Sequence, residues 1–245
     1  MEISARALSY RDLDTPLTGV LHWNAARAVA RPGILLIHGG AGLDEHARNQ
    51  ARRYAALGYA VFASDMLGDG VAGDRVRVIE CLTALRDDPA FLVRRARAGL
   101  AVLNDCPETS GGRAAIGFCF GGMAALALAR AGAELTAVVS IHGTLATSRP
   151  AETGGVRASL LVCHGALDPH VPLADVTAFA AEMDHAGADW QLIMYGGAQH
   201  GFTHEHAMPG MTAGVAYDPL ADERSFAAAR SFLATALAGQ AGQSW

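Results

Sequence analysis

Short β-rich runs alternate with longer helical runs along the 245-residue chain. The run Gly33–His38 is apolar almost throughout, as expected for a strand buried on both faces of a sheet. The pattern predicts strands at Ser4–Tyr10, Leu17–Trp23, Gly33–His38, Ala60–Ser64, Arg113–Phe118, Ala137–Ile141, Ser159–His164 and Trp190–Tyr195. It predicts helices over Glu45–Leu57, Arg75–Arg86, Pro89–Asn104, Phe120–Ala131, Leu173–Ala186 and Pro219–Leu237.

This alternation indicates an α/β fold with a mostly parallel central sheet and helices on both faces. No repeat, low-complexity block or long linker divides the sequence, and the polar stretch Thr147–Gly155 is too short to separate domains. We therefore expect a single domain over residues 1–245, with a disordered polar tail after about residue 238. In open α/β sheets, function gathers at the carboxyl ends of the strands, so the residues after each strand are the first candidates.

Composition excludes several classes of function. The formal net charge is −5, so no basic surplus is present and we expect no nucleic-acid partner. All 19 basic residues are Arg, which rules out a Lys Schiff base and a P-loop Lys. The N-terminal segment lacks a secretory pattern and no stretch reaches about twenty apolar residues, so we expect a cytoplasmic protein without membrane contact. The four cysteines show no C-x-x-C spacing and predict no disulfide framework.

A glycine-rich turn follows the predicted strand Arg113–Phe118. Its sequence GFCFGG matches the nucleophile pattern G-x-S-x-G, with Cys119 in place of Ser. Small flanking residues let neighbouring backbone approach this strained turn, and the helix that follows directs its N-terminus at the thiol and lowers its pKa. A buried structural Cys beside a packing turn would explain the same residues, so the motif alone leaves both interpretations open.

An acidic residue follows the predicted strand Ser159–His164. The segment HGALDPHVP places Asp168 in a turn, where the orienting acid of a catalytic triad belongs. An Asp before Pro is also a common turn or capping residue. Asp65 is a competing acid after Ala60–Ser64, but it precedes Cys119 in the chain, so we interpret it as a turn or capping residue.

A histidine follows the last predicted strand. His200 lies in the segment GGAQHGF after Trp190–Tyr195, and it is one of ten histidines, most of which we expect to be structural. The order of the three residues distinguishes it, because nucleophile, acid and histidine each follow a strand in the order that α/β hydrolases use. The sequence thus predicts a triad of Cys119, Asp168 and His200.

A second glycine-rich loop, HGGAG, begins at His38. It is similar to the HGGG-type loop that supplies one backbone N–H to an oxyanion hole, here from Gly40, while the N–H of Phe120 supplies the other. A phosphate-binding loop is the alternative, but the spacing G-x-G-x-x-G and the Lys are both absent.

Together these motifs resemble the dienelactone hydrolase family. The resemblance covers nearly the whole chain, from GILLIHGGAGLDEH through GFCFGG and HGALDPHVP to GAQHGF and the closing helix. It implies an α/β-hydrolase fold, no cofactor, and a triad of Cys119, His200 and Asp168. It also implies that Gly40 and Phe120 are the backbone donors of the oxyanion hole.

Two positions depart from the family pattern. Better-known members have a Glu in the loop after the third strand that accepts a hydrogen bond from the resting thiol, and Gly39 stands there in this sequence. They also have an Arg four residues after the catalytic histidine that binds a substrate carboxylate, and His204 takes that place. Arg75 or Arg77 is an alternative anionic contact.

The sequence predicts hydrolysis of a small ester, lactone or thioester through an acyl-enzyme, with His204 at the substrate. A binding protein that keeps the fold without the catalysis is the first alternative. The segment His204–Glu205–His206, together with His200, admits a metal-dependent hydrolase as the second. Its histidines lack ligand spacing on regular elements, so we expect no metal. The sequence makes no prediction of oligomeric state.

Overall fold

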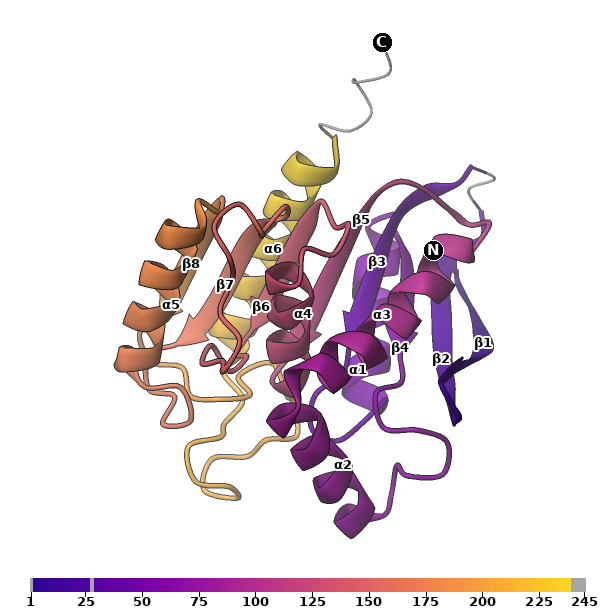
Figure 1. Ribbon diagram of the computed structural model, residues 1–245. Helices are drawn as coiled ribbons and strands as arrows, with labels where there is room; N and C mark the ends of the chain where they lie inside the picture. The colour runs from indigo at the N-terminus through magenta and orange to yellow at the C-terminus, as the bar shows by residue number, and fades with distance from the viewer. Residues whose placement is uncertain (1, 27–28, 239–245) are drawn as a thin grey trace.

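The computed structural model describes residues 2–26 and 29–238, so the tail expected after about residue 238 lies outside the described residues. Its sheet has eight strands in the order β1-β2-β4-β3-β5-β6-β7-β8 (Figure 1). Only β2 runs against the others, because it pairs antiparallel with both β1 and β4. The strands are β1 (Ile3–Asp12), β2 (Thr15–Asn24), β3 (Arg31–Ile37), β4 (Ala60–Ser64), β5 (Thr109–Phe118), β6 (Ala137–Ile141), β7 (Ser159–Gly165) and β8 (Trp190–Tyr195).

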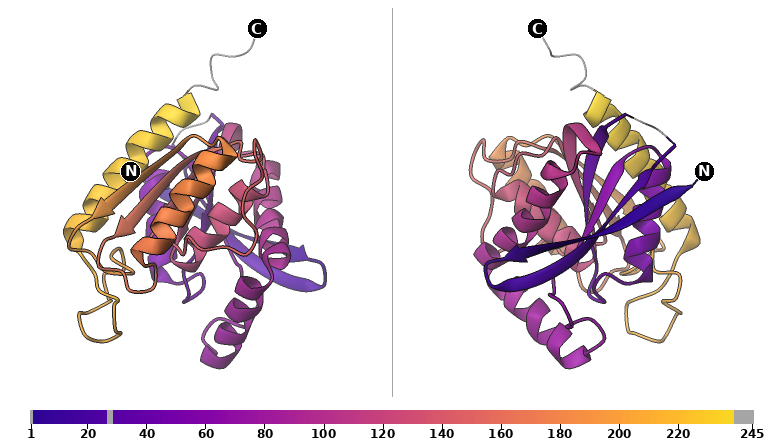
Figure 2. Two further views of the ribbon diagram at one scale, coloured as in Figure 1. Left: turned by 60° about the vertical axis from the view of Figure 1, so that its left-hand side comes forward. Right: turned by 90° about the vertical axis from the view of Figure 1, so that its right-hand side faces the viewer.

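Helices cover both faces of the sheet. They are α1 (Glu45–Ala56), α2 (Arg75–Asp87), α3 (Pro89–Asp105), α4 (Phe120–Arg130), α5 (Leu173–Ala186) and α6 (Pro219–Ala238). Helices α1 and α6 lie on one face, and α3, α4 and α5 lie on the other, with α5 and α6 on opposite sides in Figure 2. The structure is therefore an α/β-hydrolase fold with a mostly parallel sheet, as the sequence pattern predicts.

The core has two halves, one on each face of the sheet. Along β3, Ile34 and Leu36 face α1 and α6, whereas Leu35 and Ile37 face α3 and α4, and all four are fully buried. Each such side chain contributes roughly 1.5–3 kcal/mol through burial. The apolar sequence of this strand follows from its two covered faces.

All eight predicted strands and six predicted helices are present in the described residues, with ends that differ by a few positions. The first two strands are longer than predicted because they pair as one hairpin along their whole length. Aspartates fix three helix starts, since Asp44, Asp74 and Asp88 accept hydrogen bonds from the first-turn N–H groups of α1, α2 and α3. None of the described helices is long and apolar enough to cross a membrane.

The carboxyl ends of the parallel strands meet at one edge of the sheet. Helix α2 and the long loop between β8 and α6 lie beside this edge, at the bottom of Figure 1. The loops after β3, β5, β7 and β8 carry the four predicted site segments, so the topology brings them to the same edge.

Candidate functional site

Cys119 lies on a strained turn between β5 and α4. Its backbone has φ 54° and ψ −117°, a conformation that residues with a side chain rarely adopt. No side chain fits at either of the two nearby glycines. A Cβ on Gly117 would lie 1.9 Å from the carbonyl oxygen of Gly121, and a Cβ on Gly121 would lie 2.1 Å from the carbonyl oxygen of Ile37. Gly117 thus lets the turn close on itself, and Gly121 lets the elbow fit against the end of β3.

His200 and Asp168 meet Cys119 at the sheet edge. The Cys119 Sγ lies 3.0 Å from His200 Nε2, and His200 Nδ1 lies 2.8 Å from Asp168 Oδ2. The other carboxylate oxygen of Asp168 accepts the backbone N–H of His170 at 2.8 Å, which fixes the carboxylate in its turn. The structure thus brings the three residues of the predicted triad into one hydrogen-bonded row.

The pKa values of Cys119 and His200 are shifted in opposite directions. Burial raises the pKa of the Cys119 thiol, but the hydrogen bond and charge of His200 and the N–H groups of Phe120 and Gly40 outweigh it, so the pKa falls below its usual value. Burial lowers the pKa of His200, but Asp168 and the thiolate raise it to about 10. The two opposite shifts favour the thiolate–imidazolium pair over the neutral pair.

Gly40 and Phe120 direct their N–H groups toward the same sulfur. The loop after β3 that carries Gly40 is held by His38, whose Nδ1 donates to the carbonyl oxygen of Gly39 at 2.7 Å while its Nε2 accepts the N–H of Met66 at 3.0 Å. Two N–H groups that converge beside a nucleophile are the arrangement that stabilises an oxyanion.

His204 lies close to Cys119 and is partly buried. Its ring stacks on His46 with 3.7 Å between centroids, and burial lowers its pKa, which keeps the imidazole neutral. A Cβ on Gly39 would lie 3.6 Å from His204 Nε2 and 3.6 Å from the Cβ of Cys119. The two positions that depart from the family pattern, Gly39 and His204, are therefore neighbours at the thiol.

Other predicted candidates have different places. Asp65 is a turn residue, as predicted, because its carboxylate accepts the N–H groups of Leu67 and Gly68. Arg77 donates to the carbonyl oxygen of Gly70 on the exposed side of α2, so no substrate contact is assigned to it. Among the described residues, no group of three or more His, Cys, Asp or Glu side chains is arranged to hold a metal.

Sequence reasoning missed three polar residues near Cys119, of which His142 and Thr203 are buried and His46 is partly buried. His142 accepts the backbone N–H of Cys119 at its Nδ1, and its Nε2 lies 2.9 Å from Thr203 Oγ1. Thr203 Oγ1 lies 3.0 Å from His46 Nε2. His142 directly follows β6, so extending the examination of strand ends to that strand would have found it.

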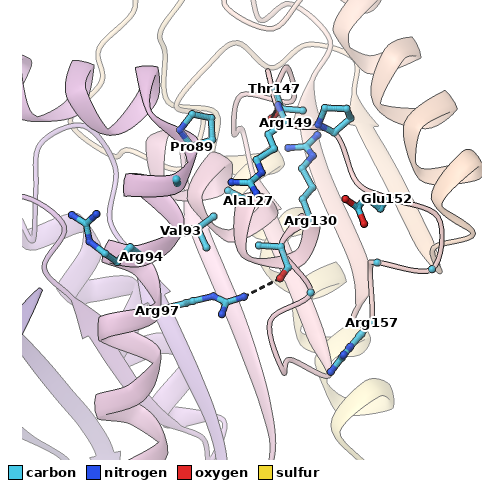
Figure 3. A pocket seen from close by; sticks show the side chains of 16 residues that line it. Pro89, Val93, Arg94, Arg97, Ala127, Arg130, Thr147, Arg149, Glu152 and Arg157 are labelled. Atoms are coloured by element: carbon cyan, nitrogen blue, oxygen red, sulfur yellow. Dashed lines mark hydrogen bonds between the residues drawn. The ribbon is translucent and has the colours of Figure 1, made fainter.

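A cleft of about 670 Å³ lies elsewhere, between α3, α4 and the loop after β6 (Figure 3). Five arginines line it: Arg94, Arg97, Arg130, Arg149 and Arg157. Asp12 pairs with Arg94 and Glu182 pairs with Arg130, which neutralises part of this charge. None of the residues of the predicted triad lines the cleft, so the cleft is separate from the predicted site at Cys119.

The sheet order, the strand–helix elbow and the positions of the site loops define the protein as an α/β hydrolase. The model of the dienelactone hydrolase family matches residues 19–237, and the chain belongs to that family.

Several similar proteins extend this finding. A solved structure called m3DLH is 39% identical, with a TM-score of 0.89, and the match covers 96% of this chain and 99% of that one. The structure of P91, described as a dienelactone hydrolase-like promiscuous phosphotriesterase from metagenomic libraries, is 38% identical with a TM-score of 0.91 and the same coverage. An uncharacterised protein of Caenorhabditis elegans, K02A2.1, is 39% identical over 131 residues, which are 51% of this chain and 80% of that protein.

Proposed function

We propose that this protein hydrolyses small carboxylic esters or lactones, with Cys119 as nucleophile, His200 as acid and base, and Asp168 as the orienting acid. The observation that carries the proposal is the 3.0 Å contact between Cys119 Sγ and His200 Nε2, on a sulfur that the N–H groups of Gly40 and Phe120 also approach. A nucleophile, an aligned base and two oxyanion donors are the parts that acyl transfer requires.

In the first half of the proposed reaction, the Cys119 thiolate attacks the carbonyl carbon and a C–S bond forms. The carbonyl oxygen becomes an oxyanion that accepts hydrogen bonds from Gly40 and Phe120. The C–O bond to the leaving group then breaks, and His200 Nε2–H protonates the departing alkoxide. In a lactone the alkoxide stays attached to the acyl group.

In the second half, His200 is neutral and removes a proton from water. The hydroxide attacks the thioester, the C–S bond breaks, and the acid and the thiolate are released. Asp168 Oδ2 accepts the hydrogen bond from His200 Nδ1, which directs Nε2 at the substrate and stabilises the imidazolium in both halves.

His204 points to uncharged substrates in this proposal. The neutral imidazole of His204 cannot form the paired hydrogen bonds that Arg makes with a carboxylate. Substrates without a carboxylate, such as short-chain esters and simple lactones, match this site better than dienelactone.

Steady-state hydrolysis of a panel of p-nitrophenyl esters and lactones tests the proposal. Cys119→Ala should lose activity while its circular dichroism stays unchanged, and Arg149→Ala, in the separate cleft, should match the wild type. Full activity in Cys119→Ala protein would refute the nucleophile. No turnover of any substrate by the wild type would favour a small-molecule binding protein.

A phosphotriester is the second candidate substrate, and the similarity to P91 over nearly the whole chain favours it. The same thiolate could attack phosphorus, with Gly40 and Phe120 facing the oxygen that gains charge. Release of p-nitrophenol from a dialkyl p-nitrophenyl phosphate measures this activity. Turnover that persists in Cys119→Ala protein would contradict it.

A further inference from the structure

A row of hydrogen bonds connects the backbone of the nucleophile to helix α1. The N–H of Cys119 is shared between the carbonyl oxygen of Ile141, at 3.0 Å, and His142 Nδ1, at 3.1 Å. From His142 Nε2 the row continues to Thr203 Oγ1 at 2.9 Å and to His46 Nε2 at 3.0 Å. None of these side chains touches the sulfur through a hydrogen bond, so the mechanism above does not use them.

The donor and the acceptor of each hydrogen bond in this row can be assigned, starting from the N–H of Cys119. A backbone N–H can only donate, so His142 Nδ1 carries no proton and the neutral ring holds its proton on Nε2. That proton is donated to Thr203 Oγ1. The hydroxyl of Thr203 then donates its own proton to His46 Nε2.

The far end of the row requires the same direction. Arg53 donates to Gln50 Oε1 at 3.2 Å, which fixes the orientation of the Gln50 amide. Gln50 Nε2 therefore faces His46 Nε2 as a donor, at 3.5 Å. His46 Nε2 accepts in this arrangement, in agreement with the assignment that starts from Cys119. The His46 proton then lies on Nδ1, which is buried and has no hydrogen-bond partner among the described residues.

The surroundings keep the row neutral. His142 is fully buried and Thr203 is 1% exposed. Burial, and then the charge of His200, hold the pKa of His142 well below its usual range, and burial lowers the pKa of His46 to about 3. A protonated His142 would lose its acceptor at Nδ1, so the bond to Cys119 requires this neutrality.

We propose that His142 is a positioning residue that holds the nucleophile elbow by accepting the Cys119 N–H. Thr203 and His46 fix the tautomer of His142 that carries its proton on Nε2. The proposal rests on the proposed function for its kinetic consequences. Both residues at the contact are strained, since His142 has φ 41° and Cys119 has φ 54°. Without the Nδ1 acceptor the elbow loses one of the two bonds that hold this conformation, and Sγ shifts relative to His200 and Phe120.

Two substitutions of His142 separate its two nitrogens. Asn places its oxygen near the position of Nδ1 and accepts positive φ readily, whereas Gln places its amide near Nε2. We expect His142→Asn to keep kcat within about threefold and His142→Gln to lose about tenfold or more in kcat with little change in KM, because displacement of a reacting atom acts on the chemical step. Similar kcat losses in both variants would overturn the proposal.

Substitution of Thr203 tests the same row without a change at the strained backbone. Thr203→Val removes the hydroxyl and should lower kcat, whereas Thr203→Ser should restore it. Adding Thr203→Val to His142→Asn should cost less than it costs in the wild type, because the pair acts as a unit. Additive losses, or a Ser variant no better than Val, would contradict the proposal even if the Gln variant failed to fold.

Alkylation of Cys119 by iodoacetamide separates this proposal from the proposed function. The rate at fixed pH reports the thiolate fraction of Cys119, which depends on the contacts of Sγ with His200 and the N–H of Phe120, and the assay does not require an ester substrate. We expect slower alkylation in His142→Gln and Thr203→Val than in His142→Asn and Thr203→Ser. That pattern would support positioning even in a protein with no esterase activity, and equal rates in all four variants would refute it.

Discussion

Gly39 leaves the thiol of Cys119 without an acidic partner, and Gly39→Glu should change its resting state. The substitution fits, because a Cβ at this position would lie 3.5–3.6 Å from its neighbours, which is ordinary contact. The same Cβ would be 3.6 Å from that of Cys119, so the two further carbons of Glu allow its carboxylate to reach the sulfur. The wild type should hold more thiolate than a free cysteine does at the same pH, since the pKa of Cys119 is lowered.

The magnitude follows from the distance. Two unit charges about 4 Å apart repel by about 4 kcal/mol at an effective dielectric constant of about 20. At 1.36 kcal/mol per pKa unit this corresponds to roughly 3 units as an upper limit. Solvent at the rim and the nearby imidazolium reduce it, so we expect Gly39→Glu to raise the pKa of Cys119 by about 1–2 units.

A pH–rate profile for iodoacetamide alkylation measures this pKa, with Gly39→Gln as the neutral control of the same size. The label is selective, because burial raises the pKa values of Cys81, Cys106 and Cys163, the last to about 12. Peptide mapping locates the label. A wild-type midpoint at or above that of a free thiol, unchanged in the Glu variant, would refute the reasoning.

Three further predictions concern the triad and the rim. The profile of kcat/KM against pH should rise as Cys119 loses its proton, at a pKa below that of a free thiol. It should fall near pH 10, because His200 there loses the proton that the leaving group needs. Constant activity from pH 9 to 11 would contradict this prediction. His200→Ala should lose about 10²–10⁴-fold in kcat, and Asp168→Ala should lose less because base and nucleophile stay in contact; kinetics that reverse this order would argue against the assigned roles. His204→Arg should raise kcat/KM for dienelactone relative to a neutral ester, and an unchanged ratio would remove His204 from substrate recognition.

The sequence was sufficient to predict the fold because local patterns of apolar and capping residues mark the strands and helices. The apolar run at β3 reflects burial on both faces, and the aspartates before α1, α2 and α3 mark helix starts. The row from Cys119 to Asp168 followed from chain order, since three parallel strands place their carboxyl ends at one edge.

The histidine row could not be predicted in the same way. His46 and Thr203 are 157 residues apart, and their contact depends on how α1 packs beside the loop after β8. The position of His142 at a strand end could be read from the sequence, but its role could not, because that role depends on an acceptor atom that faces a backbone N–H. The arginine cleft is similar, because its lining comes from two helices and a loop.

Trapping of an acyl-enzyme tests the central claim most directly. Wild-type protein is mixed with a p-nitrophenyl ester, quenched in acid within the first turnovers, and examined by intact mass and peptide mapping. The proposed mechanism predicts one acyl group per chain, on the peptide that contains Cys119, and none in Cys119→Ala protein. Ester turnover with no adduct on Cys119, or an equal adduct in the Ala variant, would contradict it.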